Sequence, residues 1–214
     1  YEISLGLVGS EMCIRDRGDT EGVFQLESSG MKQVLVGLQP QNLEDVIALI
    51  SLYRPGPMDS IPTYLRNRHE PDKISYKTPQ LAHILDVTNG CIVYQEQVMQ
   101  IFRELAGFSF GQADNVRRAM SKKKHAVMEA EREHFVHGCT EPGHECPGCV
   151  ANGIPEQVAN QIYDEMSSFA SYAFNKSHAA CYAYVAFQTA YLKCHYPSQF
   201  MAALLTSVLD NTDK

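Results

Sequence analysis

Apolar residues that recur at helical spacing, separated by proline and glycine breaks, constrain this fold most. In the clearest run, Val98, Ile101, Phe102 and Leu105 follow the i, i+3, i+4, i+7 rule before a stop at Gly107. The same reasoning predicts further helices over residues 28–38, 43–53, 112–134, 155–172, 177–194 and 198–209. Short strands are expected near 23–26 and 92–94, so the predicted fold class is mostly α.

Local signals predict where several of these helices begin and end. Asn42 is a predicted N-cap, with Asp45 at the third helical position. Ser177 is a predicted N-cap of the 177–194 helix, and Pro155 suits a first helical position. The run Arg54-Pro55-Gly56-Pro57 ends the helix that starts at residue 43, because two prolines and a glycine interrupt any periodic element.

Size and charge limit the classes of function. The 214 residues suit one domain or one large lobe of a bigger enzyme. The formal net charge is -7, so the surface as a whole does not favour nucleic acid. Any site for a polyanion must therefore be local.

Cysteine content and hydropathy indicate a cytoplasmic protein. The seven cysteines are odd in number and several lie in apolar helical patterns, which argues for reduced thiols. No secretory signal is apparent. Residues 179–192 are the most apolar stretch, but they are too few to span a bilayer and predict a buried helix. No membrane partner is expected.

The first 17 residues differ in character from the rest. They show neither strand alternation nor a helical period, and they resemble a translated sequencing adapter. We interpret 1–17 as a non-native segment and 18–214 as the protein proper. The alternative is an ordinary N-terminal strand and loop.

A dense cationic run lies within the predicted helix 112–134. At about 100° per residue, Ala113, Val116, Met120 and Val127 form an apolar stripe. The basic residues spread over a neighbouring arc: Arg117, Arg118, Lys122, Lys124 and His125. Arginine forks and lysine point charges suit a triphosphate or a nucleic-acid backbone. The alternative is a solvated charged face. Five cations in eight residues without an acidic partner until Glu129 argue for a bound anion, because like charges four residues apart repel.

Five segments in order carry a family resemblance. They are GVFQLESSGMK (22–32), LYRPGPM (52–58), VYQEQVMQI (93–101), RRAMSKKK (117–124) and FNKSHAACYA (174–183), and the similarity continues through 196–211. Together they resemble the alpha subunit of bacterial DNA polymerase III, a C-family DNA polymerase. The resemblance covers nearly everything after residue 17.

The resemblance implies a helical fingers region of a replicative DNA-directed DNA polymerase. In that family, fingers close over the incoming dNTP beside the primer–template DNA. Three palm aspartates, N-terminal to the stretch matched here, hold two Mg²⁺ ions. The chain should therefore lack the catalytic residues and be inactive alone. The sliding clamp, clamp loader and proofreading subunit would contact other regions of the parent protein.

The resemblance also implies site residues. Arg117 and Arg118 would grip the triphosphate, with Lys122 to Lys124 nearby. The motif Lys176, Ser177 and His178 would lie by the incoming nucleotide, where a helix N-terminus favours anions. For Ser177 the alternative is a purely local capping role. Arg54 is a weaker candidate, with a surface arginine beside a rigid turn as its alternative. Tyr94 and Glu96 are interpreted as an ordinary strand end and helix start.

A loop insertion at 139–153 is rich in glycine, proline and cysteine. Its residues Cys139, His144, Cys146 and Cys149 have the types of a structural Cys3His zinc site, and Cys146 and Cys149 have C-x2-C spacing. His137 is a competing ligand. The alternative is a loop with reduced thiols. The resembling family often ends this connector with a segment like 147–154 without the other ligands, which leaves Cys149 a role unconnected with metal.

Three hypotheses of function remain open at this point. The first is a polymerase fingers module. The second is a zinc-ribbon-like nucleic-acid-binding protein without catalysis, which rests on the cysteine loop and the basic helix. The third is a helical scaffold with a charged face. The ordered motifs favour the first, because neither alternative explains them.

Overall fold

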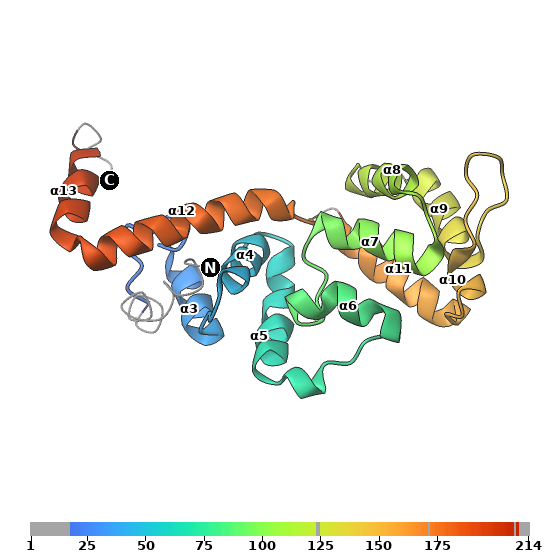
Figure 1. The fold of residues 1–214 in the computed structure, drawn as a ribbon, viewed down its shortest axis with the longest axis horizontal. Coiled ribbons are helices and arrows are strands. Elements are labelled where there is room, and N and C mark those ends of the chain that lie inside the picture. Colours follow the sequence, from blue (N-terminus) through green and yellow to red (C-terminus); the bar gives the residue numbers. More distant parts are fainter. Residues whose placement is uncertain (1–17, 123–124, 171, 208, 210–214) are drawn as a thin grey trace. The chain divides into compact units, whose positions relative to one another are not determined.

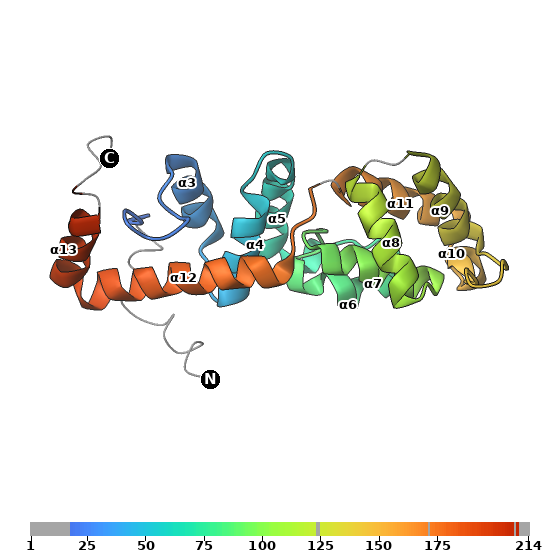
Figure 2. The same ribbon diagram turned by 90° about the horizontal axis from the view of Figure 1, so that it is seen from above.

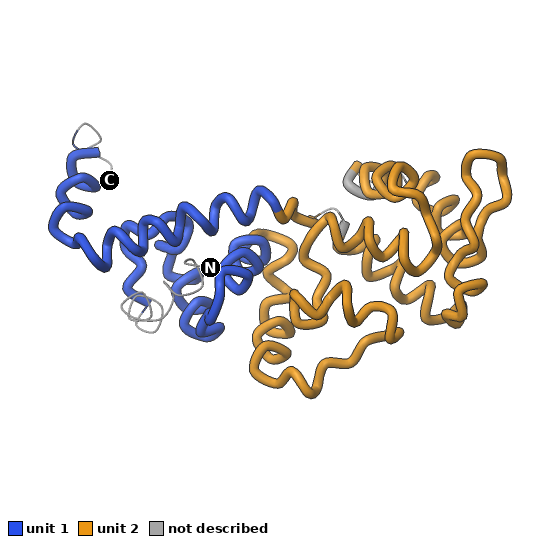
Figure 3. The backbone as a smooth tube through the Cα atoms, viewed as in Figure 1, with its two compact units in different colours: residues 1–53, 177–214 blue, residues 54–176 orange. Residues whose placement is uncertain are grey.

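The computed structural model describes residues 18–122, 125–170, 172–207 and 209. The predicted non-native segment 1–17 lies outside the described residues. The chain divides into two compact units, one of residues 1–53 with 177–214 and one of residues 54–176 (Figure 3). Each unit is built almost wholly from helices, so the predicted mostly α fold class is confirmed.

The described helices of the first unit are labelled in Figure 1. They are α3 (Ser29–Leu38), α4 (Leu43–Leu52), α12 (Lys176–His195), which begins at the boundary of the units, and α13 (Pro197–Ser207). Ser28 and Asn42 cap α3 and α4, since their side chains accept from Met31 N at 3.3 Å and Asp45 N at 2.9 Å. The Asn42 prediction is confirmed. Figure 2 shows α13 turning sharply away from the end of α12, where Pro197 begins the new helix.

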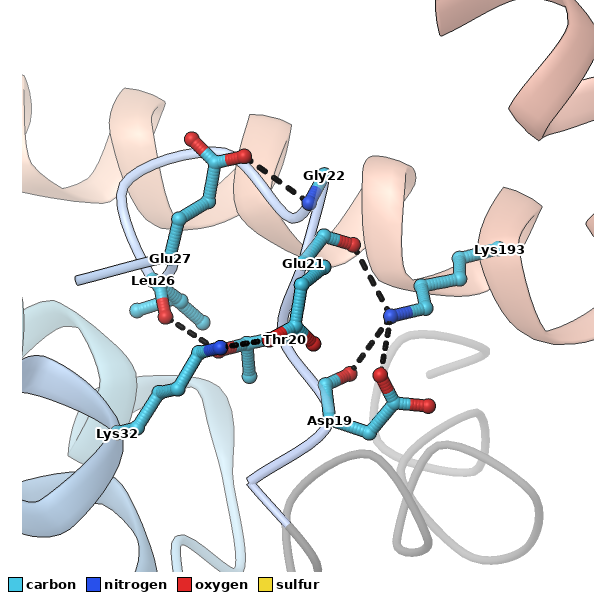
Figure 4. A network of polar contacts seen from close by, with 8 residues as sticks. All are labelled: Asp19, Thr20, Glu21, Gly22, Leu26, Glu27, Lys32 and Lys193. Carbon is cyan, nitrogen blue, oxygen red and sulfur yellow. Dashed lines mark hydrogen bonds and ion pairs between the residues drawn. The ribbon is translucent and has the colours of Figure 1, made fainter. Parts of the chain in front are cut away.

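A polar network fastens the segment before α3 to α12 (Figure 4). Lys193 Nζ donates to Asp19 Oδ1 at 2.6 Å and to the carbonyl oxygens of Asp19 and Glu21, each at 3.0 Å. The Lys32 ammonium pairs with Glu21, and this hydrogen bond is the main reason that the pKa of Glu21 falls to about 2. Asp19 and Glu21 are thus held by lysines of two helices, Lys193 of α12 and Lys32 of α3.

Helix α12 is buried along one narrow line. Ala179, Ala183 and Ala186 are buried, whereas Tyr184 and Leu192 are each 45% exposed. The prediction of a buried helix over 179–192 is therefore wrong for most of its surface, since the fully buried side chains there are three small alanines. No described helix is both long and apolar enough to cross a membrane.

The second unit is a helical array around one aromatic core. Its helices are α5 (Ile61–His69), α6 (Ala82–Leu85), α7 (Gln95–Ala106), α8 (Phe110–Ser121), α9 (His125–His137), α10 (Gly148–Ala151) and α11 (Glu156–Ala170). Short 3-10 turns lie at Pro57–Ser60, Pro71–Lys73, Pro79–Leu81 and Asp86–Thr88. Phe102 is fully buried at the centre, with its ring centroid 5.0 Å from Phe135 and 6.0 Å from Tyr163. The predicted stripe of α7 faces this core, and Gly107 ends the helix at a φ of 76°.

Buried Gln97 fixes the start of α7. Its Oε1 accepts from the backbone N–H groups of Val93 at 2.9 Å and Tyr94 at 3.0 Å. Its Nε2 donates to Ile84 O at 3.1 Å and Thr88 Oγ1 at 2.7 Å. An amide side chain that makes four hydrogen bonds is fully used, so Gln97 joins the turn after α6 to α7 without an unsatisfied buried atom.

Three predicted elements differ in the structure. The strand expected near 23–26 is absent, because residues 23–25 form a bend and a turn. The single helix expected over 112–134 is two helices, because α8 ends at Ser121 and α9 begins at His125. Ala113 and Val116 are buried as predicted, but Val127 belongs to α9 and is 41% exposed, and the Met120 side chain lies outside the described part. The strand expected over 92–94 is only an isolated parallel bridge between Tyr94 and Phe174.

Candidate nucleotide-phosphate site

The basic run falls at the end of α8. The Arg118 side chain is 65% exposed and that of Arg117 is 21% exposed. Lys122 follows α8 and is exposed. Lys123 and Lys124 lie outside the described residues. The structure thus places Arg117, Arg118 and Lys122 on one short stretch at the end of α8.

Asp114 organises the two arginines. Its Oδ1 accepts from Arg117 Nε at 3.0 Å and Nη2 at 2.7 Å, and its Oδ2 lies 2.7 Å from Arg118 Nε. The hydrogen bond from Arg117 is the largest cause of a lowered pKa for Asp114. Its carboxylate is therefore ionised at neutral pH. The basic run therefore has an acidic partner one turn upstream, contrary to the expectation that its first acidic neighbour is Glu129.

Arg117 also reaches helix α7. Its Nη1 donates to Gln95 Oε1 at 2.8 Å, and Gln95 Nε2 donates to Ala173 O at 3.0 Å. The backbone continues the link, since Gln95 N donates to Phe174 O at 2.9 Å and Phe174 N donates to Val93 O at 3.3 Å. The end of α8, the start of α7 and residues 173–174 therefore form one hydrogen-bonded unit.

Glu96 occupies the start of α12. Both of its carboxylate oxygens accept from Lys176 N at 3.1 Å, and Oε1 also accepts from Asn175 Nδ2 at 3.0 Å. Helix α12 begins at Lys176, so Ser177 lies inside the helix and its predicted N-cap role is wrong. The negative group at this helix N-terminus is supplied by the protein's own Glu96.

Lys176 contributes a charge to the same place. Its ammonium lies 5.4 Å from the centroid of the buried Tyr94 ring. A cation at that distance is attracted by the face of the ring. The side chain is thus held beside the first residues of α7.

Arg54 approaches the same segment from the Pro-Gly-Pro turn. Its guanidinium carbon lies 4.0 Å from the Phe174 ring centroid, and Nη2 donates to Tyr172 O at 2.8 Å. Burial lowers the pKa of Arg54, which still remains charged. Gly56 makes this approach feasible, because its φ is 104° and a Cβ there would lie 2.4 Å from the Tyr172 ring.

We call this arrangement the cationic junction, defined as residues 93–96 and 172–176 with the contacting side chains of Arg54 and Arg117. The junction contains three cations from distant parts of the sequence, namely Arg54, Arg117 and Lys176. Rigidly held guanidinium and ammonium groups suit phosphate oxygens. Groups of this kind are able to bind and orient a polyphosphate by charge and hydrogen bonding.

Ser177 and His178 belong to the first unit by their contacts. Both are exposed on the first turn of α12. The His178 ring packs on Tyr182, with centroids 4.3 Å apart. The two residues are thus available on the surface of α12.

The cysteine loop is a small hairpin over a buried thiol. Cys139 and Cys146 exchange two backbone hydrogen bonds of 2.9 Å, and Cys149 is fully buried. Among the described residues, which include this whole loop, no three His, Cys, Asp or Glu side chains are placed to hold one metal ion. Zinc binding by Cys139, His144, Cys146 and Cys149 stays a prediction, which metal analysis of the purified chain would check.

Burial predicts low reactivity for one of these thiols. It raises the pKa of Cys149 to about 12, whereas Cys181 is exposed. Since the thiolate is the nucleophile, we expect Cys149 to react with iodoacetamide at pH 8 at least about 100-fold more slowly than Cys181. Peptide mass spectrometry of timed samples measures both rates. In denaturant the two rates should become similar, and similar rates without denaturant would contradict the packing described for Cys149.

The sequence did not point to three residues as members of the site: Gln95 and Glu96 in the junction, and Asp114 beside it. Asp114 carried a local signal, its i+3 and i+4 spacing to two arginines. Gln95 and Glu96 carried none, because their partners lie 22 and 80 positions away in the chain. Such contacts follow only from the fold.

Comparison with known proteins matches this chain to one family. Residues 12–143 match the family described as bacterial DNA polymerase III alpha subunit finger domain. DNA polymerase III subunit alpha of Thermus aquaticus is 51% identical over 203 residues, which is 92% of this chain and 16% of the relative. The proteins of the same name from Staphylococcus epidermidis strain ATCC 12228 and Staphylococcus aureus strain N315 are 48% and 47% identical, over 92% of this chain and 18% of each relative.

The chain therefore spans less than a fifth of the length of these relatives. A zinc-ribbon-like protein is not favoured, because the match extends far beyond the cysteine loop. The expected resemblance is confirmed: the chain belongs to the finger domain family of the bacterial DNA polymerase III alpha subunit.

Proposed function

We propose that this chain forms the fingers of a DNA-directed DNA polymerase and binds the triphosphate of the incoming dNTP. The observation that carries the proposal is the cationic junction, where Arg54, Arg117 and Lys176 contact one short pair of segments. Arg118 and Lys122 extend the same charge outward from α8. Phosphoryl transfer requires positioning and neutralisation of phosphate charge, and cations on a rigid frame supply both.

The remaining parts of the reaction belong to other regions of the parent protein in this proposal. Mg²⁺, held by the palm, would polarise the reacting phosphate and activate the primer hydroxyl. Residues 18–214 would hold the nucleotide and contact primer–template DNA. Sliding clamp, clamp loader and proofreading subunit would bind elsewhere on the parent, and the whole enzyme would act in the cytoplasm, where bacterial DNA is replicated.

A chimera tests this proposal. Residues 18–214 replace the corresponding stretch of the full-length Thermus aquaticus relative, to which this chain is 51% identical. We expect the chimera to extend a primed template and residues 18–214 alone to make no product. A chimera that folds and binds primer–template DNA, but incorporates no nucleotide at millimolar dNTP, would contradict the proposal.

A further inference from the structure

We propose that Gln95 is a positioning residue, which orients Arg117 toward the nucleotide phosphates without neutralising its charge. This inference rests on the proposed function of the basic end of α8. Gln95 is the first residue of α7 and is half-buried. It does not need to touch the nucleotide, because it acts through Arg117.

Both the oxygen and the nitrogen of the Gln95 side-chain amide form hydrogen bonds. Its Oε1 accepts from Arg117 Nη1 at 2.8 Å, and its Nε2 donates to Ala173 O at 3.0 Å. Its backbone N–H donates to Phe174 O at 2.9 Å. An amide side chain can accept from an arginine through its oxygen and donate to a carbonyl through its nitrogen at the same time. The Arg117 fork is therefore fixed against a backbone segment as well as against its own helix.

Charge explains why a neutral residue suits this position. Arg117 and Arg118 share the single carboxylate of Asp114, so these three charges sum to +1. A glutamate at position 95 would also accept from Arg117, but it would bring that sum to zero. Phosphate binding depends on the net positive charge near the phosphate oxygens. An amide at position 95 orients Arg117 and leaves the net charge at +1, whereas a second carboxylate would reduce it to zero.

The next residue of α7, Glu96, also positions a cationic residue of the junction. Glu96 holds the backbone N–H of Lys176, the first residue of α12, with two contacts of 3.1 Å. Consecutive residues of one helix therefore set the orientation of Arg117 and the position of Lys176. The Glu96 carboxylate lies at the N-terminus of α12, where a negative charge stabilises the helix. The neutral Gln95 amide lies at Arg117, where a negative charge would cancel the charge of the arginine.

Single-nucleotide incorporation by the full-length chimera tests the role of Gln95. Gln95→Met keeps the length of the side chain and removes both hydrogen bonds. We expect it to raise the apparent Kd for dNTP about tenfold and to change the maximal rate less than about twofold, since a lost charge-assisted bond weakens binding by that order. Gln95→Glu, which keeps the acceptor, should also raise the apparent Kd at least about fivefold. Gln100→Met is the matched control, because Gln100 lies on the same helix and its side chain donates to the exposed carboxylate of Glu104 at 2.7 Å, outside the cationic junction.

A double-mutant cycle separates positioning from a general structural effect. If Gln95 acts through Arg117, Gln95→Met should change the apparent Kd less than about twofold in the Arg117→Ala background. If the increases in apparent Kd caused by Gln95→Met and Arg117→Ala multiply in the double variant, the positioning role is overturned. An unchanged apparent Kd in Gln95→Met, with a raised one in Arg117→Ala, would overturn the inference and leave the proposed function standing. If Arg117→Ala itself has no effect, the triphosphate role of α8 fails and the inference fails with it.

Discussion

Replacing Gln97 with leucine is expected to lower the free energy of unfolding by about 3–5 kcal/mol, because it strands several buried polar groups at once. The Gln97 residue is 4% exposed. Leucine would leave four groups without this partner, namely Val93 N, Tyr94 N, Ile84 O and Thr88 Oγ1. Urea denaturation of residues 18–214, followed by circular dichroism, measures the change.

Gln100→Leu is the control for this stability prediction. Gln100 lies three residues further along α7 and bonds to Glu104 at an exposed position. A surface change of this kind should cost less than about 0.5 kcal/mol. Equal unfolding midpoints for Gln97→Leu and the unmodified chain would show that the network around Gln97 contributes no net stability.

The double change Arg117→Ala and Arg118→Ala is expected to lower kcat/KM for dNTP incorporation by the chimera about 1000-fold. Each arginine can offer charge-assisted hydrogen bonds to phosphate, and two such losses correspond to a loss of this order in transition-state stabilisation. Both residues lie at the end of α8 and share Asp114. Steady-state primer extension over a range of dNTP concentrations measures the effect.

Arg103→Ala provides the matched control for the arginine pair. Arg103 lies on α7 in the same unit, with its guanidinium carbon 5.8 Å from the Phe110 ring centroid. It has no place in the cationic junction, so its loss should alter kcat/KM less than about threefold. Comparable losses from Arg103→Ala and from the double variant would indicate a general effect of removing positive charge.

The parts of this fold that depend on near neighbours could be predicted from the sequence. The start of α4 follows from Asn42, whose side chain bonds three residues ahead. The stripe of α7 and its stop at Gly107 likewise depend on residues within one or two turns. These local patterns predict the structure correctly because the contacts they imply, within one or two helical turns, form in the folded protein.

The parts that depend on distant neighbours could not be predicted. No glycine or proline marks the end of α8, so the sequence pattern continued the helix to residue 134. Ser177 has the residue type of an N-cap, but α12 starts one residue earlier, where Glu96 contacts it from 80 positions away. The roles of Arg117 and Arg118 were proposed from type and resemblance, whereas their shared carboxylate and the Gln95 contact required the structure.

The most direct measurement of the central claim is the affinity of the chimera for dNTP relative to dNMP on a dideoxy-terminated primer–template. If the end of α8 holds the outer phosphates, the unmodified chimera should bind dNTP at least about 100-fold more tightly than dNMP. The Arg117→Ala and Arg118→Ala variant should then reduce this preference to less than about tenfold. If the variant keeps the full preference for the triphosphate, the basic end of α8 does not bind it, and the account of the site is wrong.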